Sequence, residues 1–296
     1  MTPDAAPGLV ERLPAGWQGY ARLARFDRPA GAWLLYLPCL WGLFLAGRGA
    51  WEWVALFALG AVAMRSAGCV WNDIIDRDLD ARVARTAARP IASGAISVAA
   101  GRRFMLALVA VGFIIWLLLA PAARLVALAS LLLVAAYPFM KRITWWPQAW
   151  LGLTFNWGVL VAAAQASGGV PAWTVALYAA GIAWTLAYDT IYALQDIEDD
   201  AIAGVRSSAR ALGPHVRAGV RLFASLAAGL LALALWLRLP DPLVVLAALP
   251  FALHLAWQAM ALRPADPANA LHLFRANRDA GWLAAAACLV VGLAAP

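Results

Sequence analysis

The stretch Asn72-Asp73-Ile74-Ile75-Asp76-Arg77-Asp78-Leu79-Asp80-Ala81-Arg82 decides how the rest of this chain is interpreted. It places four carboxylates and one amide within nine residues, directly after an apolar run that begins near Val54. A second acidic cluster follows much later and consists of Asp189, Asp196, Glu198, Asp199 and Asp200. The two clusters together hold nine of the sixteen acidic residues. We therefore expect them to face each other across one site that binds divalent metal.

The composition around these clusters is that of a membrane protein. Hydrophobic residues make up 64% of the 296 residues and charged residues 13%, which is about half the charged share of soluble domains. The mean hydropathy is +0.75, and one soluble core could not bury that much apolar surface. The net charge of +7 does not indicate a nucleic-acid partner, because the basic residues lie in short loops, where they orient membrane helices.

We expect an all-α, polytopic fold with nine membrane-spanning helices in a single domain over residues 1–296, preceded by a cytoplasmic N-terminal segment, residues 1–20. A spanning helix needs roughly 20 mostly apolar residues. The candidate runs are Gly31–Ala46, Trp51–Val70, Phe104–Leu119, Ala123–Met140, Ala149–Ala166, Ala172–Ala193, Ala218–Leu237, Leu243–Leu262 and Gly281–Ala294.

The distribution of Lys and Arg supports this count. With the N-terminus inside, nineteen of the twenty-three basic residues fall in inner segments. Three fall in outer segments (Arg48, Arg124 and Arg238), and Arg65 lies within a helix. Cytoplasmic loops retain Lys and Arg, so we expect the N-terminus inside, the C-terminus outside and both acidic clusters at the cytoplasmic face.

The two clusters are also related by a shift of 120 residues, which maps Asp76 onto Asp196 and Asp80 onto Asp200. Four expected helices separate the pairs, so the shift preserves helix direction. The pattern suggests an internal duplication, with two four-helix units plus a ninth helix.

Helical periodicity places Asn72, Asp76 and Asp80 on one stripe, because they are spaced i, i+4, i+8. Asp78 lies on a different face, and Asp73 is in the motif but outside this stripe. Like charges at this spacing destabilise a bare helix, so a cation is needed. Hard oxygen ligands favour Mg²⁺, which is often shared with substrate phosphates. A solvated acidic loop neutralised by nearby arginines is the alternative for one cluster alone.

Other polar residues accompany these clusters. Asp189 and Tyr192 precede Asp196 by about two turns and one turn. Arg65 lies about two turns before Asn72, and a charge inside a membrane helix is a functional candidate by default, although pairing with an acidic neighbour would also explain it. Lys141 and Arg142 end the fourth run. There they could be functional residues or simply an anchor at the membrane surface.

The two acidic motifs and the sequence around them resemble a known protein family. Asn72-Asp73-x-x-Asp76-x-x-x-Asp80 is similar to the first acidic motif of the UbiA superfamily of intramembrane aromatic prenyltransferases, and Tyr188-Asp189-x-x-Tyr192-x-x-x-Asp196-x-x-x-Asp200 to the second. The segments around Arg25, Arg65 and Arg89, and the run from Tyr137 to Gln148, resemble the branch that acts on 4-hydroxybenzoate in the ubiquinone pathway.

This resemblance implies nine helices around a central cavity, a Mg²⁺ cofactor, and polyprenyl diphosphate and 4-hydroxybenzoate as substrates. It implies a bilayer location, and for this chain we expect a bacterial inner membrane. It assigns the Mg²⁺–diphosphate to Asn72, Asp76, Asp80, Asp196 and Asp200. It also matches Arg142 to a basic residue associated with the aromatic acid or the diphosphate, and Arg206 to a phosphate contact. From their positions in the sequence we add Arg65, Lys141 and Tyr192 as substrate contacts and Asp189 as the expected proton acceptor. Arg206 stands where the family often has Lys, which preserves the positive charge.

Three alternatives stay open. The acceptor could be another aromatic compound, such as a naphthoate, homogentisate or haem. A cation or lipid transporter could also pair acidic helices, although transporter sites usually lie near the membrane midplane. A CDP-alcohol phosphotransferase would carry a Gly- and Arg-interrupted Asp pattern, which is absent here.

Overall fold

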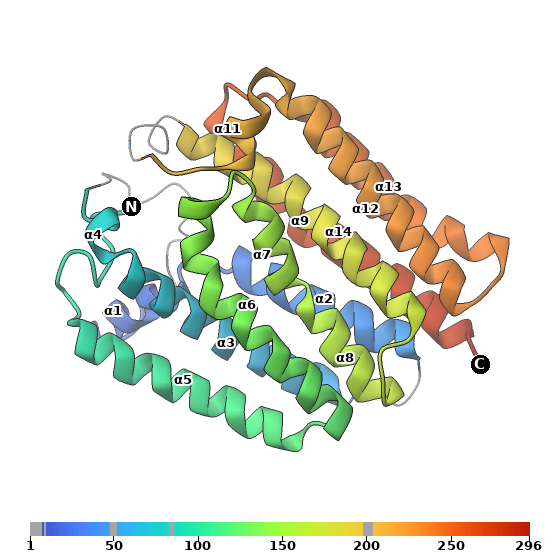
Figure 1. The fold of residues 1–296 in the computed structure, drawn as a ribbon, viewed down its shortest axis with the longest axis horizontal. Helices are drawn as coiled ribbons and strands as arrows, with labels where there is room; N and C mark the ends of the chain where they lie inside the picture. The colour runs from blue at the N-terminus through green and yellow to red at the C-terminus, as the bar shows by residue number, and fades with distance from the viewer. Residues whose placement is uncertain (1–7, 9, 48–51, 83–85, 198–203) are drawn as a thin grey trace. The chain divides into compact units, whose positions relative to one another are not determined.

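The computed structural model describes residue 8 and residues 10–47, 52–82, 86–197 and 204–296, with the backbone alone for Asp196. Every regular element within those ranges is helical, which confirms the all-α class. The α-helices (Figure 1) are α1 Ala15–Leu23, α2 Ala30–Ala46, α3 Trp53–Ile75, α4 Arg77–Asp80, α5 Val98–Leu118, α6 Pro121–Ile143, α7 Pro147–Phe155, α8 Trp157–Ser167, α9 Ala172–Ala193, α11 Ser208–Leu212, α12 Val216–Arg238, α13 Leu249–Ala261 and α14 Pro267–Ala294. The short 3₁₀ helices are η1 Leu194–Asp196, η2 Gly213–His215 and η3 Pro242–Ala248.

Five helical segments are long and apolar enough to cross a bilayer: Trp53–Ile75, Val98–Leu118, Pro121–Ile143, Ser208–Arg238 and Pro242–Ala261. The chain is therefore an integral-membrane protein. Each of the nine expected runs contains helix, but two are composite: α7 and α8 divide at Asn156, and η3 leads into α13. Helix α14 begins at Pro267, well before the expected start at Gly281. The count of nine crossings stays a prediction.

Two basic residues assigned to the outer side satisfy carbonyl groups at helix ends. Arg238 donates from Nε to the Leu45 carbonyl oxygen at 3.0 Å, at the end of α2. Arg124 donates from Nε to the Leu119 carbonyl oxygen at 2.7 Å. The last carbonyls of a helix have no partner within the helix, and cations are favourable there. These two exceptions to the charge bias therefore have a local structural cause.

The chain divides into two compact units, one of residues 1–33 and 58–118 and the other of residues 34–57 and 119–296. The division falls at other places than the four-helix units expected from the sequence, so the duplication stays a prediction. The smaller unit holds α1, most of α3, α4 and α5. Its apolar cluster contains Leu23, Val70 and Ile91, with the Tyr20 and Phe104 rings 5.2 Å apart beside it.

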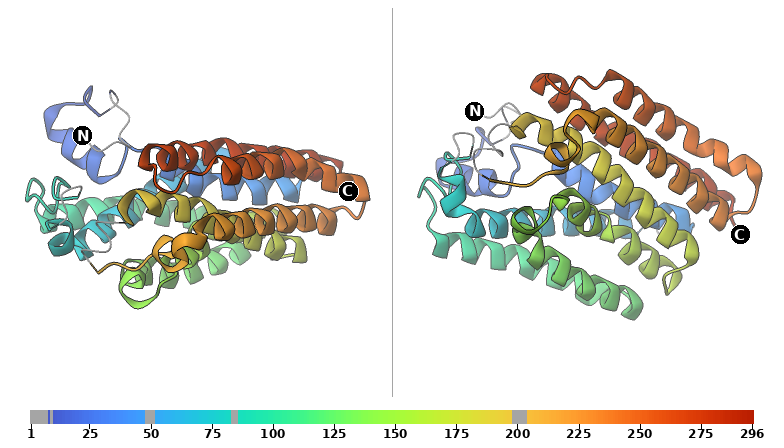
Figure 2. Two further views of the ribbon diagram at one scale, coloured as in Figure 1. Left: turned by 90° about the horizontal axis from the view of Figure 1, so that it is seen from above. Right: turned by 45° about the horizontal axis from the view of Figure 1, so that its top comes forward.

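Helix α9 is the centre of the larger unit. It packs against α12, α7, α14 and α8, and α12 runs alongside it in both figures (Figures 1 and 2). Trp184 of α9 lies at its core, with the Trp41 ring 5.0 Å away and the Phe251 ring 6.5 Å away. The indole nitrogen of Trp184 donates to the Asn277 side-chain oxygen at 2.8 Å. A buried indole N–H needs such a partner, and the bond ties α14 to α9.

Candidate functional site

The first acidic motif spans a break between two helices. Helix α3 ends at Ile75, and Asp76 precedes α4 with φ −93° and ψ 5°. The Asp76 amide still donates to the Asn72 carbonyl at 2.9 Å, and the Asp80 amide to the Asp76 carbonyl at 2.8 Å. Both bonds have helical i to i−4 spacing. The expected stripe of Asn72, Asp76 and Asp80 therefore continues through the break.

Burial separates the four carboxylates of this motif. Asp73, Asp76 and Asp80 are buried, with exposures of 1%, 0% and 5%. The Asp78 side chain is 78% exposed and forms an ion pair only with the adjacent Arg77 among the described residues. Asp78 thus lies on the solvent side, as its different helical face predicts. Buried carboxylates need charge partners, so the partners of the other three decide what the motif can bind.

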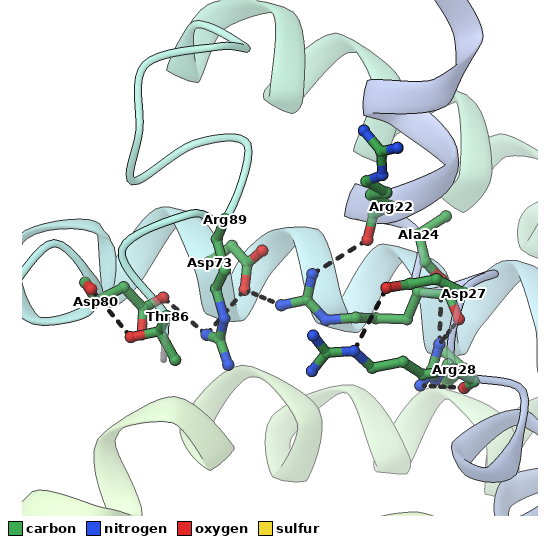
Figure 3. A network of polar contacts seen from close by, with 10 residues as sticks. Arg22, Ala24, Asp27, Arg28, Asp73, Asp80, Thr86 and Arg89 are labelled. Carbon is green, nitrogen blue, oxygen red and sulfur yellow. Dashed lines mark hydrogen bonds and ion pairs between the residues drawn. The ribbon is translucent and has the colours of Figure 1, made fainter. Parts of the chain in front are cut away.

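Asp73 and Asp80 share one guanidinium (Figure 3). Arg89 Nη1 lies 2.7 Å from Asp80 Oδ2 and 3.2 Å from Asp73 Oδ1. Arg25 Nη2 approaches the same Asp73 oxygen at 2.6 Å. Thr86 Oγ1 donates to the Asp80 carbonyl oxygen at 2.9 Å, which fixes the start of the Arg89 segment beside α4. Two carboxylates and two guanidinium groups therefore form one compact, charge-balanced network.

Asp73 was ambiguous in the sequence because it falls outside the i, i+4, i+8 stripe. Seven residues are about two helical turns, so Asp73 and Asp80 differ by only ~20° around a helix. The sequence therefore already indicated, through the i, i+7 spacing, that Asp73 and Asp80 share a face. It did not indicate that Arg25 and Arg89 are their partners. Burial raises the pKa of the Asp80 carboxyl, and the ion pair with Arg89 offsets this only in part.

The guanidinium of Arg65 donates its hydrogen bonds to backbone carbonyls. From the sequence alone, an ion pair with an acidic neighbour is the alternative to a functional role. Arg65 Nη1 donates to the carbonyl oxygens of Ala24 and Arg25, both at 3.1 Å, and its Nη2 to that of Arg28 at 3.3 Å. These carbonyls follow the end of α1. Gly31 leaves room for the guanidinium, since a Cβ there would lie 2.7 Å from Nη2. Arg65 thus holds the turn that presents Arg25 to Asp73, and its expected contact with substrate stays a prediction.

The residues of the first motif fit a hard divalent cation in their chemistry. Asp73 Oδ2 is buried and has no hydrogen-bond partner in the part of the chain that the structure describes. Carboxylate oxygens are the ligands that Mg²⁺ prefers, usually completed by water and substrate phosphates. The described ranges contain no group of three or more His, Cys, Asp or Glu side chains placed to hold an ion by themselves. The motif would therefore need oxygen ligands from elsewhere.

The second acidic cluster begins at the C-terminal end of α9. Asp189 is partly exposed there, and the Tyr192 ring lies 4.5 Å from the Phe274 ring of α14. Asp196 ends η1, and its side chain lies outside the described part. Asp200 also lies outside the described residues, as do Glu198 and Asp199. The clusters belong to different units, so their meeting across one site stays a prediction.

Three expected substrate contacts come together within the larger unit. The Arg206 amide donates to the Lys141 carbonyl at 3.1 Å, and Arg206 Nη1 donates to the Ile143 carbonyl at 2.6 Å. Lys141 and Arg142 form the last turn of α6. The Arg206 guanidinium also lies over the Trp145 ring, 5.7 Å from its centroid. The end of α6 is therefore a basic cluster built from segments more than sixty residues apart.

Side chains that the sequence argument did not single out hold this cluster beside α9. The Ser208 amide donates to Gln148 Oε1 at 2.9 Å. The hydroxyls of Ser208 and Thr190 are 2.6 Å apart, and all three residues are buried. Thr190 follows Asp189 directly, so these bonds bring the Arg206 segment to the acidic end of α9. The signal that could have found Gln148 is its place in the run from Tyr137 to Gln148, which resembles the family, and Ser208 lies two residues after Arg206.

Comparison with known proteins agrees with this description. The model of the UbiA prenyltransferase family matches residues 35–278. The mitochondrial 4-hydroxybenzoate polyprenyltransferase of Arabidopsis thaliana is 45% identical over 226 residues, covering 75% of this chain and 56% of its own. The protein of that name from Bos taurus is 48% identical over 210 residues, covering 69% and 57%. This chain therefore spans little more than half the length of these relatives.

Among solved structures, a UbiA homolog from Archaeoglobus fulgidus bound to GPP and Mg²⁺ superposes with a TM-score of 0.70. Its sequence identity is 18%, and the match covers 93% of this chain and 99% of that one. At that identity the likeness concerns the fold alone. The family match over most of the chain, together with the identities to the two relatives, is decisive: the chain belongs to the UbiA prenyltransferase family.

Proposed function

We propose that this chain transfers a polyprenyl group from polyprenyl diphosphate to the ring of 4-hydroxybenzoate, ortho to its hydroxyl, in ubiquinone biosynthesis. The observation that carries the proposal is the burial of the Asp76 and Asp80 carboxylates of the stripe, beside a buried Asp73 oxygen that lacks a hydrogen-bond partner among the described residues. The names of the relatives supply the acceptor and the polyprenyl donor. The A. fulgidus homolog, bound to GPP and Mg²⁺, supports a divalent metal.

The metal ligands in this proposal are Asn72, Asp76, Asp80, Asp196 and Asp200. Bound Mg²⁺ would supply neutralisation of the diphosphate as its bond to the allylic carbon breaks. The basic cluster of Lys141, Arg142 and Arg206 would bind the same diphosphate, since Arg and Lys stabilise charge that develops on a leaving group. Tyr192 and Arg65 complete the proposed substrate contacts.

The remaining steps belong to the apolar helices and to Asp189. Apolar walls keep water away from the allylic cation, so that the activated ring carbon attacks it instead. The ring then loses the proton from that carbon. We assign the proton acceptor to Asp189, because it lies one residue from the bond that brings the Arg206 segment to α9.

The membrane placement is part of the same proposal. We propose nine crossings around a central cavity, with the N-terminus and both acidic clusters at the cytoplasmic face of a bacterial inner membrane. The nineteen-to-three distribution of basic residues supports this orientation. The names of the relatives assign those proteins to mitochondria, so fractionation of the cells that express this chain decides the compartment.

The test is the incubation of membranes with Mg²⁺, polyprenyl diphosphate and labelled 4-hydroxybenzoate. Asp76→Ala and Asp196→Ala should each abolish labelled lipid product while the protein stays folded in the membrane. Asp78→Ala is the matched control in the same motif, and it should retain activity because Asp78 faces solvent. Turnover retained in Asp76→Ala would refute the metal assignment. If the unaltered chain gives no labelled product, the assignment of 4-hydroxybenzoate as the acceptor is refuted. The same assay with other aromatic acids then tests the acceptor, and diphosphates of several lengths test the choice of donor.

A further inference from the structure

Arg89 occupies the position that a cation would take between two carboxylates. One of its nitrogens, Nη1, contacts both Asp80 Oδ2 at 2.7 Å and Asp73 Oδ1 at 3.2 Å (Figure 3). Asp73 has a second guanidinium, that of Arg25, at 2.6 Å. Within the described ranges, Arg89 is the ion-pair partner of Asp80. The two carboxylates therefore depend on Arg89 to different degrees.

The way in which the Arg89 segment is held allows the Arg89 guanidinium to leave the two carboxylates. Arg89 lies in the non-helical segment 86–97, and its side chain is 21% exposed, against 7% for that of Asp80. The Thr86 hydroxyl holds the same segment to the Asp80 carbonyl independently of Arg89. The guanidinium can thus move into solvent while the segment stays attached. Two like charges on one buried helical face need a cation between them, and a metal ion at Asp80 would be repelled by the guanidinium that already neutralises this carboxylate at 2.7 Å.

We propose that Arg89 is an exchangeable placeholder for the metal, and that a divalent cation and the Arg89 guanidinium compete for Asp80. The inference rests on the proposed function only in that it takes Asp80 as a metal ligand. Arg89 keeps the Asp80 carboxylate compensated before the ion arrives. Metal binding breaks the contacts of Arg89 to Asp80 and Asp73, while Arg25 stays on Asp73. Because coupling between two occupants of one site is reciprocal, loss of the guanidinium makes the metal bind more tightly.

The experiment is a titration of the purified full chain in detergent with Mn²⁺ alone, in which the paramagnetic resonance signal of free Mn²⁺ reports binding without any turnover. Arg89→Gln should bind Mn²⁺ about tenfold more tightly than the unaltered chain, equivalent to ~1.4 kcal/mol. Arg77→Gln is the matched control, because it removes the same charge nearby, and within the described part of the chain Arg77 forms an ion pair only with the exposed Asp78. Arg77→Gln should change the affinity by less than about twofold, since exposed pairs contribute little.

The sign of the effect decides the inference. If Arg89 only supported Asp80, Arg89→Gln would weaken Mn²⁺ binding or leave it unchanged, and either result overturns the competition. An equal tightening in Arg77→Gln that disappears at high salt also overturns it, because screening would then explain both. If the Gln variant does not fold, Arg89→Lys replaces it in the test, because it keeps the charge. Arg89→Lys should bind Mn²⁺ with an affinity between those of the unaltered chain and Arg89→Gln. An unchanged Mn²⁺ affinity counts against competition.

Failure of the inference is distinguishable from failure of the proposed function. If the unaltered chain binds Mn²⁺ and Arg89→Gln does not bind it more tightly, only the placeholder role fails. If neither binds Mn²⁺, the metal assignment of the first motif fails, and the placeholder role fails with it.

Discussion

Replacement of Arg65 by Met tests whether the turn after α1 depends on this side chain. Met keeps much of the apolar stem and removes all the donors. Three hydrogen bonds are lost, to the carbonyls of Ala24, Arg25 and Arg28. Two of these carbonyls keep another donor, because the Ser66 hydroxyl also bonds Ala24 and the Arg28 amide also bonds Arg25.

These contacts set the magnitude. A hydrogen bond from a charged donor contributes about 1.5–3 kcal/mol, and a carbonyl that keeps a second partner loses less. We therefore expect a loss of about 2–4 kcal/mol from the free energy of unfolding. Arg25 adds to the effect, because its φ of 61° lies in a region that costs a non-glycine residue on the order of 1 kcal/mol. Without Arg65, one restraint on that conformation and on the contact of Arg25 with Asp73 is gone.

The assay is thermal unfolding of the purified protein in detergent, with and without prenyl diphosphate. For a chain of this size, the expected loss corresponds to a fall in Tm of roughly 5–10 °C. Arg102→Met is the matched control, because Arg102 is an exposed arginine of α5 in the same unit; its effect should stay within about 0.5 kcal/mol. Arg65→Lys should lie between the two, since an ammonium cannot reach three carbonyls in the same geometry.

One result would refute this reasoning. If Arg65→Met unfolded at the same temperature as Arg102→Met but lost the stabilisation that added prenyl diphosphate gives, Arg65 would act on the substrate and not on the turn. Bound ligand stabilises only the folded state, so the two conditions separate these roles.

Three further predictions concern packing and the acidic motif. Gly292→Ala should lower the thermal stability strongly, because a Cβ would collide with a backbone carbonyl of α2. Gly229→Ala, with open space around it inside α12, should keep or slightly raise the stability, because Ala favours a helix interior; equal melting temperatures of the two variants would contradict this packing. Asp73→Asn should cost about 3–5 kcal/mol, because it removes the carboxylate that pairs with the Arg25 guanidinium, whereas Asp78→Asn should cost less than about 0.5 kcal/mol. Chemical denaturation measures both, and similar losses would refute the assigned burial. Gln148→Leu should cost about 1–3 kcal/mol, because it leaves a buried amide N–H without its acceptor, and an unchanged Tm would contradict that bond.

The sequence by itself determined the class of protein and the position of the first acidic stripe. Apolar runs of about spanning length follow from bilayer thickness, and the structure has helices at all nine runs, although Asn156 divides one of them. Helical periodicity is equally local: the i, i+4 bonds from Asp76 to Asn72 and from Asp80 to Asp76 continue the stripe through a helix break. It also placed Asp78 on the solvent side. A pattern of this kind depends only on neighbours within two turns, so the sequence contains it.

Only the tertiary structure decided the partners of these side chains. Arg25 meets Asp73 across 48 residues, and Arg206 meets the Ile143 carbonyl across 63. Such pairings depend on where the chain turns back. Several arginines lie near each carboxylate in the sequence, so the sequence does not show which of them forms the ion pair. The acceptors of Arg65 and Arg206 could not be read at all, because every residue carries the same backbone carbonyl and only folding determines which carbonyls are left without a partner at a helix end.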